Sequence, residues 1–191
     1  MFRALITALD GIPCEPGIKI LREFRTGTLF PEIGCARITV EAGILVARGA
    51  FRDFDIYSDA TANNQELWKL GDTFELIFGE EGRQDYFEVQ VAPNGPQLEL
   101  HIPDCRTFRA IPHAKKICDI GLQSRTVILS EQNLWLAELR IPLRSVGISE
   151  DRLRYVAIRQ NHTHGRETEI TAGAVFPETA HTPELWERYP A

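Results

Sequence analysis

The stretch WKLGDTFELIF, residues 68–78, decides the fold that this sequence can adopt. From position 73 onward apolar and polar residues alternate. In an extended strand this spacing places Phe74, Leu76 and Phe78 on one side and Glu75 on the other. A strand with one apolar side needs a second layer of structure to cover that side. The stretch therefore predicts a sheet with one face packed into a core.

A second stretch, DYFEVQVAPNG at 85–95, alternates in the same way, with Phe87 and Val89 on one side and Glu88 on the other. It ends in Pro-Asn-Gly, which is a strong turn signal. Further strand candidates are 36–41 and 44–52 around the tight-turn pair Ala42-Gly43, then 97–102, 117–129 with an interruption, 134–141, 154–161 and 167–172. Many short strands between Gly and Pro turns predict an all-β fold, a two-sheet antiparallel β-sandwich of immunoglobulin-like or jelly-roll-like kind with little helix.

The 191 residues fit one such sandwich, so we expect a single domain spanning 1–191. Residues 1–35 are rich in Gly and Pro, which indicates one short strand followed by an irregular segment packed on the sandwich. A helical turn is expected only at 183–188. The alternation predicts a core that contains Phe74, Leu76, Phe87, Val89, Trp135, Leu139 and Ile141.

Composition excludes several classes of partner. The formal net charge is −6, and no stripe of Lys and Arg appears, so a nucleic-acid partner is not expected. No apolar run approaches the length that a membrane span needs, so a membrane partner is not expected either. The sequence does not determine the oligomeric state.

The compartment and the thiol state are linked questions. The first residues lack the apolar stretch of a signal peptide, and the localisation stays unassigned. The cysteines at 14, 35, 105 and 118 form no C-x-x-C pair, which argues against a zinc site built on them. Free thiols are expected, and a disulfide is the alternative if the protein is exported.

A third stretch, WLAELRIPL at 135–143 followed by Val146-Gly147, completes a set of motifs. Together with 68–78 and 85–95 it resembles the family 9 carbohydrate-binding modules and their relatives in the DOMON-like superfamily. The resemblance covers roughly residues 36–189. It implies a β-sandwich that binds a carbohydrate, often outside the cell, and it makes a structural calcium ion a candidate cofactor.

The residues themselves suggest where a sugar would bind. An aromatic side chain can cover the apolar face of a pyranose while charged and amide groups meet its hydroxyls. A strand order like that of the resembled family would gather Glu75, Glu88, Arg159 and Asn161 on one outward sheet face, with Trp68 at its edge.

The resemblance implies ligand roles for Glu75 and for the Arg159 and Asn161 positions. It also implies a second aromatic near the C-terminus, where this chain has His181. The alternative to a binding site is a solvated face with weak cross-strand ion pairs.

Two weaker patterns concern metals. His162 and His164 could share one side of a strand with Glu167 or Glu169, an arrangement that partly resembles a metal site, although surface-loop histidines explain it as well. Asp53, Asp55 and Asp59 surround a polar loop and provide oxygen ligands of the kind that calcium takes. Solvated loop acids are the alternative reading of these three residues.

Two functions compete on these observations. The first is a non-catalytic domain that recognises a mono- or oligosaccharide. The second is a carbohydrate-active enzyme that uses a metal at His162 and His164 or the carboxylates of Glu75 and Glu88. No G-x-S-x-G, H-E-x-x-H, P-loop or dinucleotide motif supports an enzyme. A haem-binding relative is the least supported, since Met1 is the only methionine available for Met–His ligation.

Overall fold

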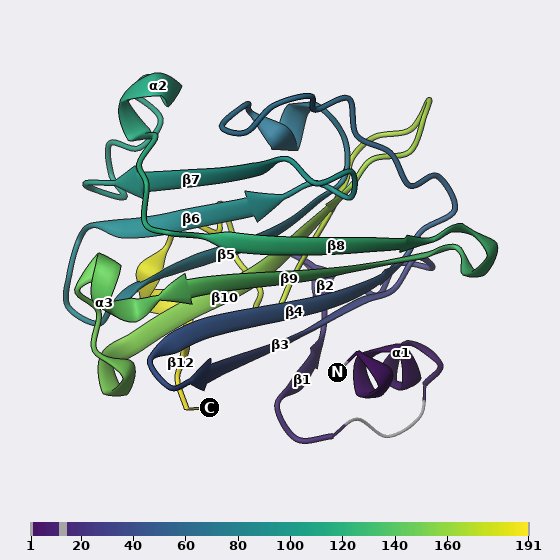
Figure 1. The fold of residues 1–191 in the computed structure, drawn as a ribbon, viewed down its shortest axis with the longest axis horizontal. Helices are drawn as coiled ribbons and strands as arrows, with labels where there is room; N and C mark the ends of the chain where they lie inside the picture. Colours follow the sequence, from purple (N-terminus) through teal and green to yellow (C-terminus); the bar gives the residue numbers. More distant parts are fainter. Residues whose placement is uncertain (1, 12–14, 191) are drawn as a thin grey trace.

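Two antiparallel sheets make up the computed structural model, which describes residues 2–11 and 15–190. The first sheet has five strands in the order β1-β3-β4-β9-β8 (Figure 1). Their bounds are β1 Ile18–Ile20, β3 Gly34–Glu41, β4 Ile44–Arg52, β8 Gln123–Leu129 and β9 Leu134–Pro142. The tight hairpin expected between β3 and β4 is confirmed. Ala42 and Gly43 both have positive φ, 51° and 78°, as a type I′ turn requires.

The second sheet has seven strands. Six follow the order β2-β11-β10-β5-β6-β7, and β12 pairs with the start of β10. The bounds are β2 Arg22–Glu23, β5 Thr73–Glu80, β6 Tyr86–Val91, β7 Gln97–Ile102, β10 Leu153–Asn161, β11 Glu169–Ala172 and β12 Glu187–Arg188. The helices are short: α1 Arg3–Leu9, α2 His113–Lys116 and α3 Leu143–Val146, with 3-10 turns at Leu67–Lys69, Ser130–Gln132, Glu150–Arg152 and Pro183–Leu185. The predicted two-sheet sandwich is confirmed.

The core lies between the two sheets and follows from the period-2 alternation. Residues predicted to be buried are buried, namely Phe74, Leu76, Phe87, Val89, Trp135, Leu139 and Ile141. Trp135 packs on Phe51 with ring centroids 4.4 Å apart, and Phe51 packs in turn on Phe74 at 5.2 Å. These three rings join β4, β5 and β9, so aromatic burial couples the sheets.

The described part of the N-terminal segment contains more regular structure than the one short strand expected within residues 1–35. It contains α1 and two short strands, and α1 packs on the outer side of the five-stranded sheet. Leu5, Ala8 and Leu9 of α1 meet Ala50 and Leu136 there. The helix is only seven residues long, and its stability comes from this tertiary burial rather than from intrinsic helix propensity.

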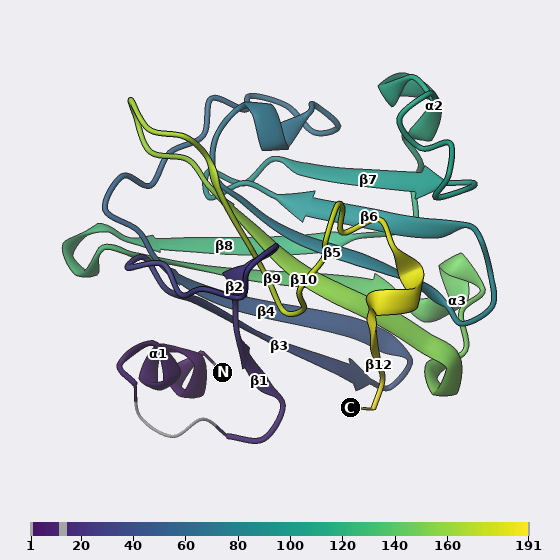
Figure 2. The ribbon, with the colours of Figure 1, turned by 180° about the vertical axis from the view of Figure 1, so that it is seen from behind.

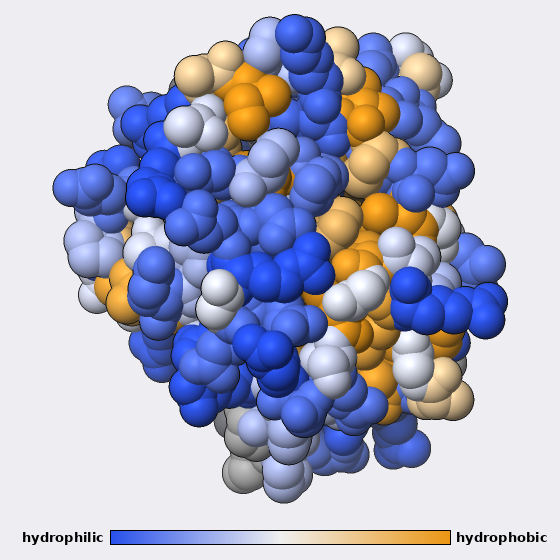
Figure 3. Space-filling view, turned by 90° about the vertical axis from the view of Figure 1, so that its left-hand side faces the viewer, coloured by the Kyte–Doolittle hydropathy of each residue, from blue (hydrophilic) through white to orange (hydrophobic). Residues whose placement is uncertain are grey.

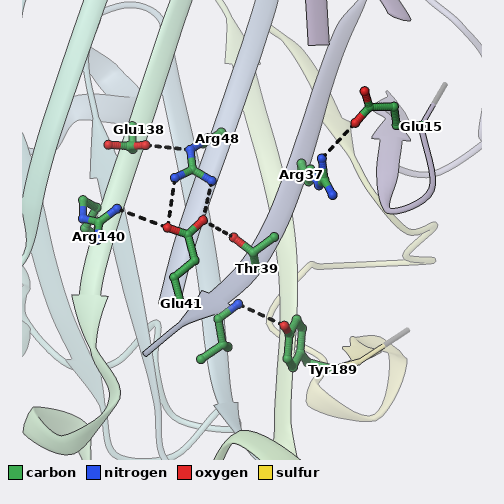
Figure 4. Close-up of polar contacts among 9 residues, drawn as sticks. Glu15, Arg37, Thr39, Glu41, Arg48, Glu138, Arg140 and Tyr189 are labelled. Atoms are coloured by element: carbon green, nitrogen blue, oxygen red, sulfur yellow. Dashed lines mark hydrogen bonds and ion pairs between the residues drawn. The ribbon is translucent and has the colours of Figure 1, made fainter. Parts of the chain in front are cut away.

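The rest of that outer side is polar. Figure 4 shows Arg48 held between Glu41 and Glu138, with Nη1 at 2.7 Å from Glu41 Oε1 and Nε at 2.6 Å from Glu138 Oε2. Arg140 approaches Glu41 from β9, at 3.6 Å. This is the cross-strand pairing of a solvated sheet face. The end of the sandwich that carries α3 is also mostly hydrophilic, with a band of hydrophobic side chains between the polar flanks (Figure 3).

The outer side of the seven-stranded sheet is different, because further chain covers it. Figure 2 shows the C-terminal segment crossing in front of β5 and β10. Phe176 and Trp186 of this segment are buried in a second apolar cluster, together with Ile77, Val156 and Ile158 of the sheet. Both faces of β10 are therefore buried.

Two remaining features concern thiols and helices. Burial raises the pKa of the Cys118 thiol to about 11. Cys14 lies outside the described residues, and the expectation that no disulfide forms stays a prediction. Within 2–11 and 15–190, none of the helices has the length and hydropathy of a membrane span.

Candidate functional site

The candidate site lies on the outer side of the seven-stranded sheet, where strand pairing sets polar residues among apolar ones. Residues directly opposite in antiparallel strands share a face. One row across the sheet consists of Leu98, Gln90, Glu75 and Ile158. The next row consists of Leu100, Glu88, Ile77 and Val156. Glu75 and Glu88 thus occupy one face, on the side opposite the core residues Phe74 and Phe87.

Neither carboxyl group is solvated, although the sequence suggested an open face. Glu75 is 4% exposed and Glu88 is 7% exposed. Thr73 Oγ1 donates to Glu75 Oε1 at 2.8 Å, and Gln160 Nε2 donates to the same oxygen at 2.7 Å. Gln90 Nε2 donates to Glu88 Oε1 at 2.6 Å. All three donors are neutral, so hydrogen bonds orient the carboxyls without balancing a negative charge.

Burial accordingly favours the protonated carboxyls. Two causes raise the pKa of Glu75 to about 8: first the loss of water around the carboxyl, and second its electrostatic interaction with the nearby Glu88. Burial raises the pKa of Glu88 as well, against the lowering effect of the Gln90 hydrogen bond. At neutral pH the pair therefore keeps a proton. Two such groups in a covered position are typical of a functional site, though structural networks produce the same effect.

His181 comes from the C-terminal segment and closes over this face. The Tyr86 hydroxyl is hydrogen-bonded to His181 Nδ1 at 2.7 Å, and Phe108 stacks on the imidazole with centroids 3.9 Å apart. His181 Nε2 lies 3.9 Å from Glu88 Oε2, too far for a hydrogen bond. Burial lowers the pKa of His181 to about 4, and the positive charges of Lys116 and Arg109 add to this effect. The imidazole is therefore neutral at pH 7.

A pocket of about 160 Å³ opens beside these residues. Its floor is formed by strand residues that include Glu75 and Gln160, and its apolar walls include Phe24, Ile77, Ile158 and Ile170. Residues 178–181 close another side. A larger hollow of about 400 Å³ lies at the β5–β6 hairpin. Most of its charged side chains are already paired, as in Arg83 with Asp85 and Arg154 with Glu81, so fewer of them are available to a ligand.

Trp68 lies in the 3-10 turn Leu67–Lys69 and packs, half-buried, against the apolar cluster of the same face. Its ring meets His113 edge-on at 5.6 Å and has Lys69 Nζ 5.9 Å from its centroid. It does not line the pocket that contains Glu75. Trp68 and His181 therefore border different parts of the covered face.

Known structures share this arrangement of sheets. A protein of Bacteroides uniformis described as carbohydrate-binding is 12% identical with a TM-score of 0.63, over 96% of this chain and 88% of its own. Family 9 carbohydrate-binding modules of Caldicellulosiruptor kristjanssonii match as well. The complex with glucose is 10% identical with a TM-score of 0.56, over 88% of this chain and 82% of its own.

The complex with cellotriose is 11% identical with a TM-score of 0.53, over 81% of this chain and 70% of its own. The chain has the fold of a family 9 carbohydrate-binding module. At these identities the likeness concerns the fold alone. No family model and no curated protein matches the sequence.

Within this family 9 fold, the expected position of Arg159 and Asn161 is wrong. Arg159 pairs with Phe74, a core residue, and so points between the sheets rather than toward Glu75. It is fully buried, donating from Nη2 to Asp53 Oδ2 at 2.9 Å and to Asn161 Oδ1 at 2.6 Å. Asn161 is 2% exposed and donates to Glu169 Oε2 at 3.2 Å. Both residues belong to an internal polar network, and the family 9 resemblance placed them on the wrong face.

The histidine pair does not assemble a metal site. His164 Nδ1 lies 2.7 Å from Asp55 Oδ2, and the His164 ring packs against the ring of Tyr57. His162 Nδ1 lies 3.3 Å from Thr168 Oγ1. Across residues 2–11 and 15–190, no group of three or more His, Cys, Asp or Glu side chains is arranged to hold a metal ion.

The three aspartates considered as calcium ligands each interact with a different partner. Asp53 is paired with Arg159 in the interior, and Asp55 is bound to His164. The backbone N–H of Asp59 donates a hydrogen bond to the Leu70 carbonyl at 2.7 Å. In the described ranges these residues do not form a calcium cage, which requires several oxygens around one point.

Sequence reasoning identified Glu75 and His181 of the pocket lining and missed its other residues, of which Gln160 and Phe24 are the most informative. Gln160 follows Val156 and Ile158 on alternate positions of β10, and an amide at the end of an apolar row is a signal that could have identified it. Phe24 gave no such signal, because it belongs to the N-terminal segment and reaches the pocket only through the pairing of β2 with β11.

Proposed function

We propose that this chain is a non-catalytic carbohydrate-binding domain and that the pocket beside Glu75 is its sugar site. One observation carries the proposal. Hydrogen-bonding groups fixed on the rigid floor of a sheet, Glu75 and Gln160, face a small pocket whose other lining residues are mostly apolar, with Glu178, Thr179 and His181 on one side. A small number of placed polar groups within an apolar lining is the usual composition of a small-molecule site.

The chemistry of a pyranose fits this lining. Phe24, Ile77 and Ile170 offer flat apolar surface to the C–H groups of a sugar ring. The Glu75 carboxyl and the Gln160 amide meet hydroxyl groups at the ring edge. His181 completes the wall on the side where the family 9 resemblance implied an aromatic residue.

The fold gives further support. Two of the solved structures with this arrangement of sheets are complexes with glucose and cellotriose. Fold alone does not determine function, so the proposal depends on the pocket and its residues.

The test is a glycan array followed by calorimetry on the sugars that bind. One covered pocket with few charged contacts supports a Kd of roughly 10 μM to 1 mM, about −7 to −4 kcal/mol. Glu75→Gln and Phe24→Ala should each weaken binding, Phe24→Ala by about tenfold through loss of ring contact. Glu131 is an exposed acid in the 3-10 turn between β8 and β9, so Glu131→Gln is the matched control and should bind like the parent.

Trp68→Ala separates two positions for the sugar. Trp68 does not line the pocket, so this variant should retain affinity. Binding that is lost in Trp68→Ala and kept in Phe24→Ala would move the site to the edge of the sheet. Release of new reducing ends from a bound oligosaccharide, abolished by Glu75→Gln, would favour the glycosidase alternative.

A further inference from the structure

The pocket beside Glu75 is unusual in its charges. Two carboxyl groups line it, buried Glu75 and exposed Glu178, and no lysine or arginine does. The guanidinium of Arg25 stacks on the outer wall residue Phe24, 5.0 Å from the ring centroid, but Arg25 is exposed and outside the lining. A bound group would therefore meet negative or neutral side chains only.

One acceptor on the sheet beside the pocket, outside its lining, has no donor among the described residues. Thr73, Gln160 and Gln90 already direct their donors to the two glutamates. Gln90 is only 1% exposed, and its Oε1 atom receives no hydrogen bond from the described chain. Gln90 lies directly opposite Glu75 in the pairing of β5 with β6. A buried acceptor without a donor is costly and is commonly satisfied by a water or a ligand.

We propose that the pocket selects a sugar with a protonated amino group over the corresponding neutral sugar. This inference rests on the proposed function and names the class of sugar. An ammonium group brings one positive charge and three N–H donors to a lining that has no cationic side chain. A hydroxyl brings a single donor and no charge.

Groups around Glu75 determine what happens to its proton. Glu88 faces it from β6, and its carboxyl also favours the neutral form. His181 and Tyr86 are neutral at pH 7, while Lys116 and Arg109 act on this region from the segment before β8. Glu75 therefore keeps its proton near neutral pH in the free protein. When an ammonium sugar binds, the carboxyl ionises, a charge-assisted hydrogen bond forms, and the proton passes to the buffer.

Calorimetry on matched sugars tests the inference. Glucosamine, galactosamine and mannosamine are compared with glucose, galactose and mannose at about pH 7, where a large part of such amines is protonated. We expect the best amino sugar to bind roughly five- to tenfold more tightly than its neutral partner. Repeating the titration in two buffers of different ionisation enthalpy should show net proton release with the amino sugar and none with the neutral sugar. The release is less than one proton because the unprotonated part of the amine takes up a proton on binding.

Two variants assign the effect to the pocket. Glu75→Gln should bring amino and neutral sugars to equal affinity and should abolish proton release. Glu178→Gln, at an exposed position that the fold does not need, should reduce the preference by about twofold at low salt. Glu131→Gln should leave the preference unchanged. Thermal unfolding of each variant shows that the sandwich is intact.

Different results would contradict the amino-sugar preference, the selection of a sugar and the proposed function. Neutral sugars that bind as tightly as the amino sugars, and weaken in Glu75→Gln, would overturn the preference and leave the sugar site in place. Cyclohexylamine binding as tightly as glucosamine would overturn the selection of a sugar. If none of the six sugars binds and the glycan array is also negative, the proposed function fails and this inference fails with it.

Discussion

Arg159 and Asp53 form an ion pair inside the sandwich, with Nη2 of Arg159 2.9 Å from Oδ2 of Asp53 and both side chains fully buried. Arg159 Nη1 also donates to the Glu32 carbonyl at 2.8 Å, and the guanidinium lies 5.5 Å from the Phe51 ring centroid. The pair links β10 to the chain after β4 and to the segment before β3. Its role is structural, since no part of it reaches the pocket on the other side of the sheet.

Removal of the arginine alone should be costly. Arg159→Met leaves Asp53 buried without a cation, and we expect a loss of about 3–5 kcal/mol in the free energy of unfolding, measured by urea denaturation. The double variant Arg159→Met with Asp53→Leu removes both charges and should recover much of this loss. A loss below about 1 kcal/mol in the single variant would show that water or another cation reaches Asp53.

Stability should fall as pH rises through neutrality because of Glu75. Its folded pKa of about 8 lies above the unfolded value near 4.5. Between these two values the native state binds more protons than the unfolded state, so stability decreases with increasing pH. Glu75→Gln has no proton to lose at this position. Urea denaturation at about pH 5, 6, 7 and 8 should therefore show a less negative slope for Glu75→Gln than for the parent, by up to about 1 kcal/mol per pH unit.

The opposite sign is expected for Glu41 on the five-stranded sheet. Hydrogen bonds from Arg48 lower the pKa of Glu41 from 4.5 to about 2 (Figure 4). Its contribution to stability is therefore complete above about pH 4.5 and is lost as pH falls toward 2. Glu41 is well exposed, so the contribution stays below about 1 kcal/mol. Glu41→Gln should reduce the acid sensitivity of unfolding in this window, and an unchanged acid profile would mean that water screens the pair completely.

Gly71 should tolerate no side chain. Its φ is +142°, and a Cβ atom there would lie 2.5 Å from the Tyr57 carbonyl oxygen and 2.6 Å from Ser58 Cα. Gly71→Ala therefore adds a backbone clash to conformational strain, and we expect a loss of about 2–4 kcal/mol in thermal or urea unfolding. Gly95 is the matched control. It has φ +112° and nothing within 4 Å of its Cβ position, so Gly95→Ala should cost only the strain, about 1–2 kcal/mol. Equal losses in the two variants would contradict the clash.

The sequence by itself determined the main strands from β3 to β10 and the residues packed between the two sheets. Period-2 alternation in β5 and β6 assigned Phe74 and Phe87 to one face and Glu75 and Glu88 to the other, because successive side chains of a strand point to opposite sides. The pair Ala42-Gly43 specified a tight hairpin through local turn geometry. Such inferences succeed because they depend on residues that are neighbours in sequence.

Strand β10 shows where this reasoning ends. Tyr155 and Ala157 face the core, while Val156 and Ile158 are equally buried on the outer side. A strand that is apolar on both sides has no alternation to orient it. Only its pairing with β5 decides that Arg159 points between the sheets and Gln160 toward the pocket.

The pocket itself was decided by tertiary structure. Phe24, Glu75, Gln160 and His181 come from four segments far apart in the chain and meet only after both ends of the chain fold across the seven-stranded sheet. That covering removes water from Glu75 and raises its pKa. Sequence pattern can place a carboxyl on a sheet face, but whether that carboxyl is solvated or buried depends on long-range burial, because desolvation comes from every segment that packs over it.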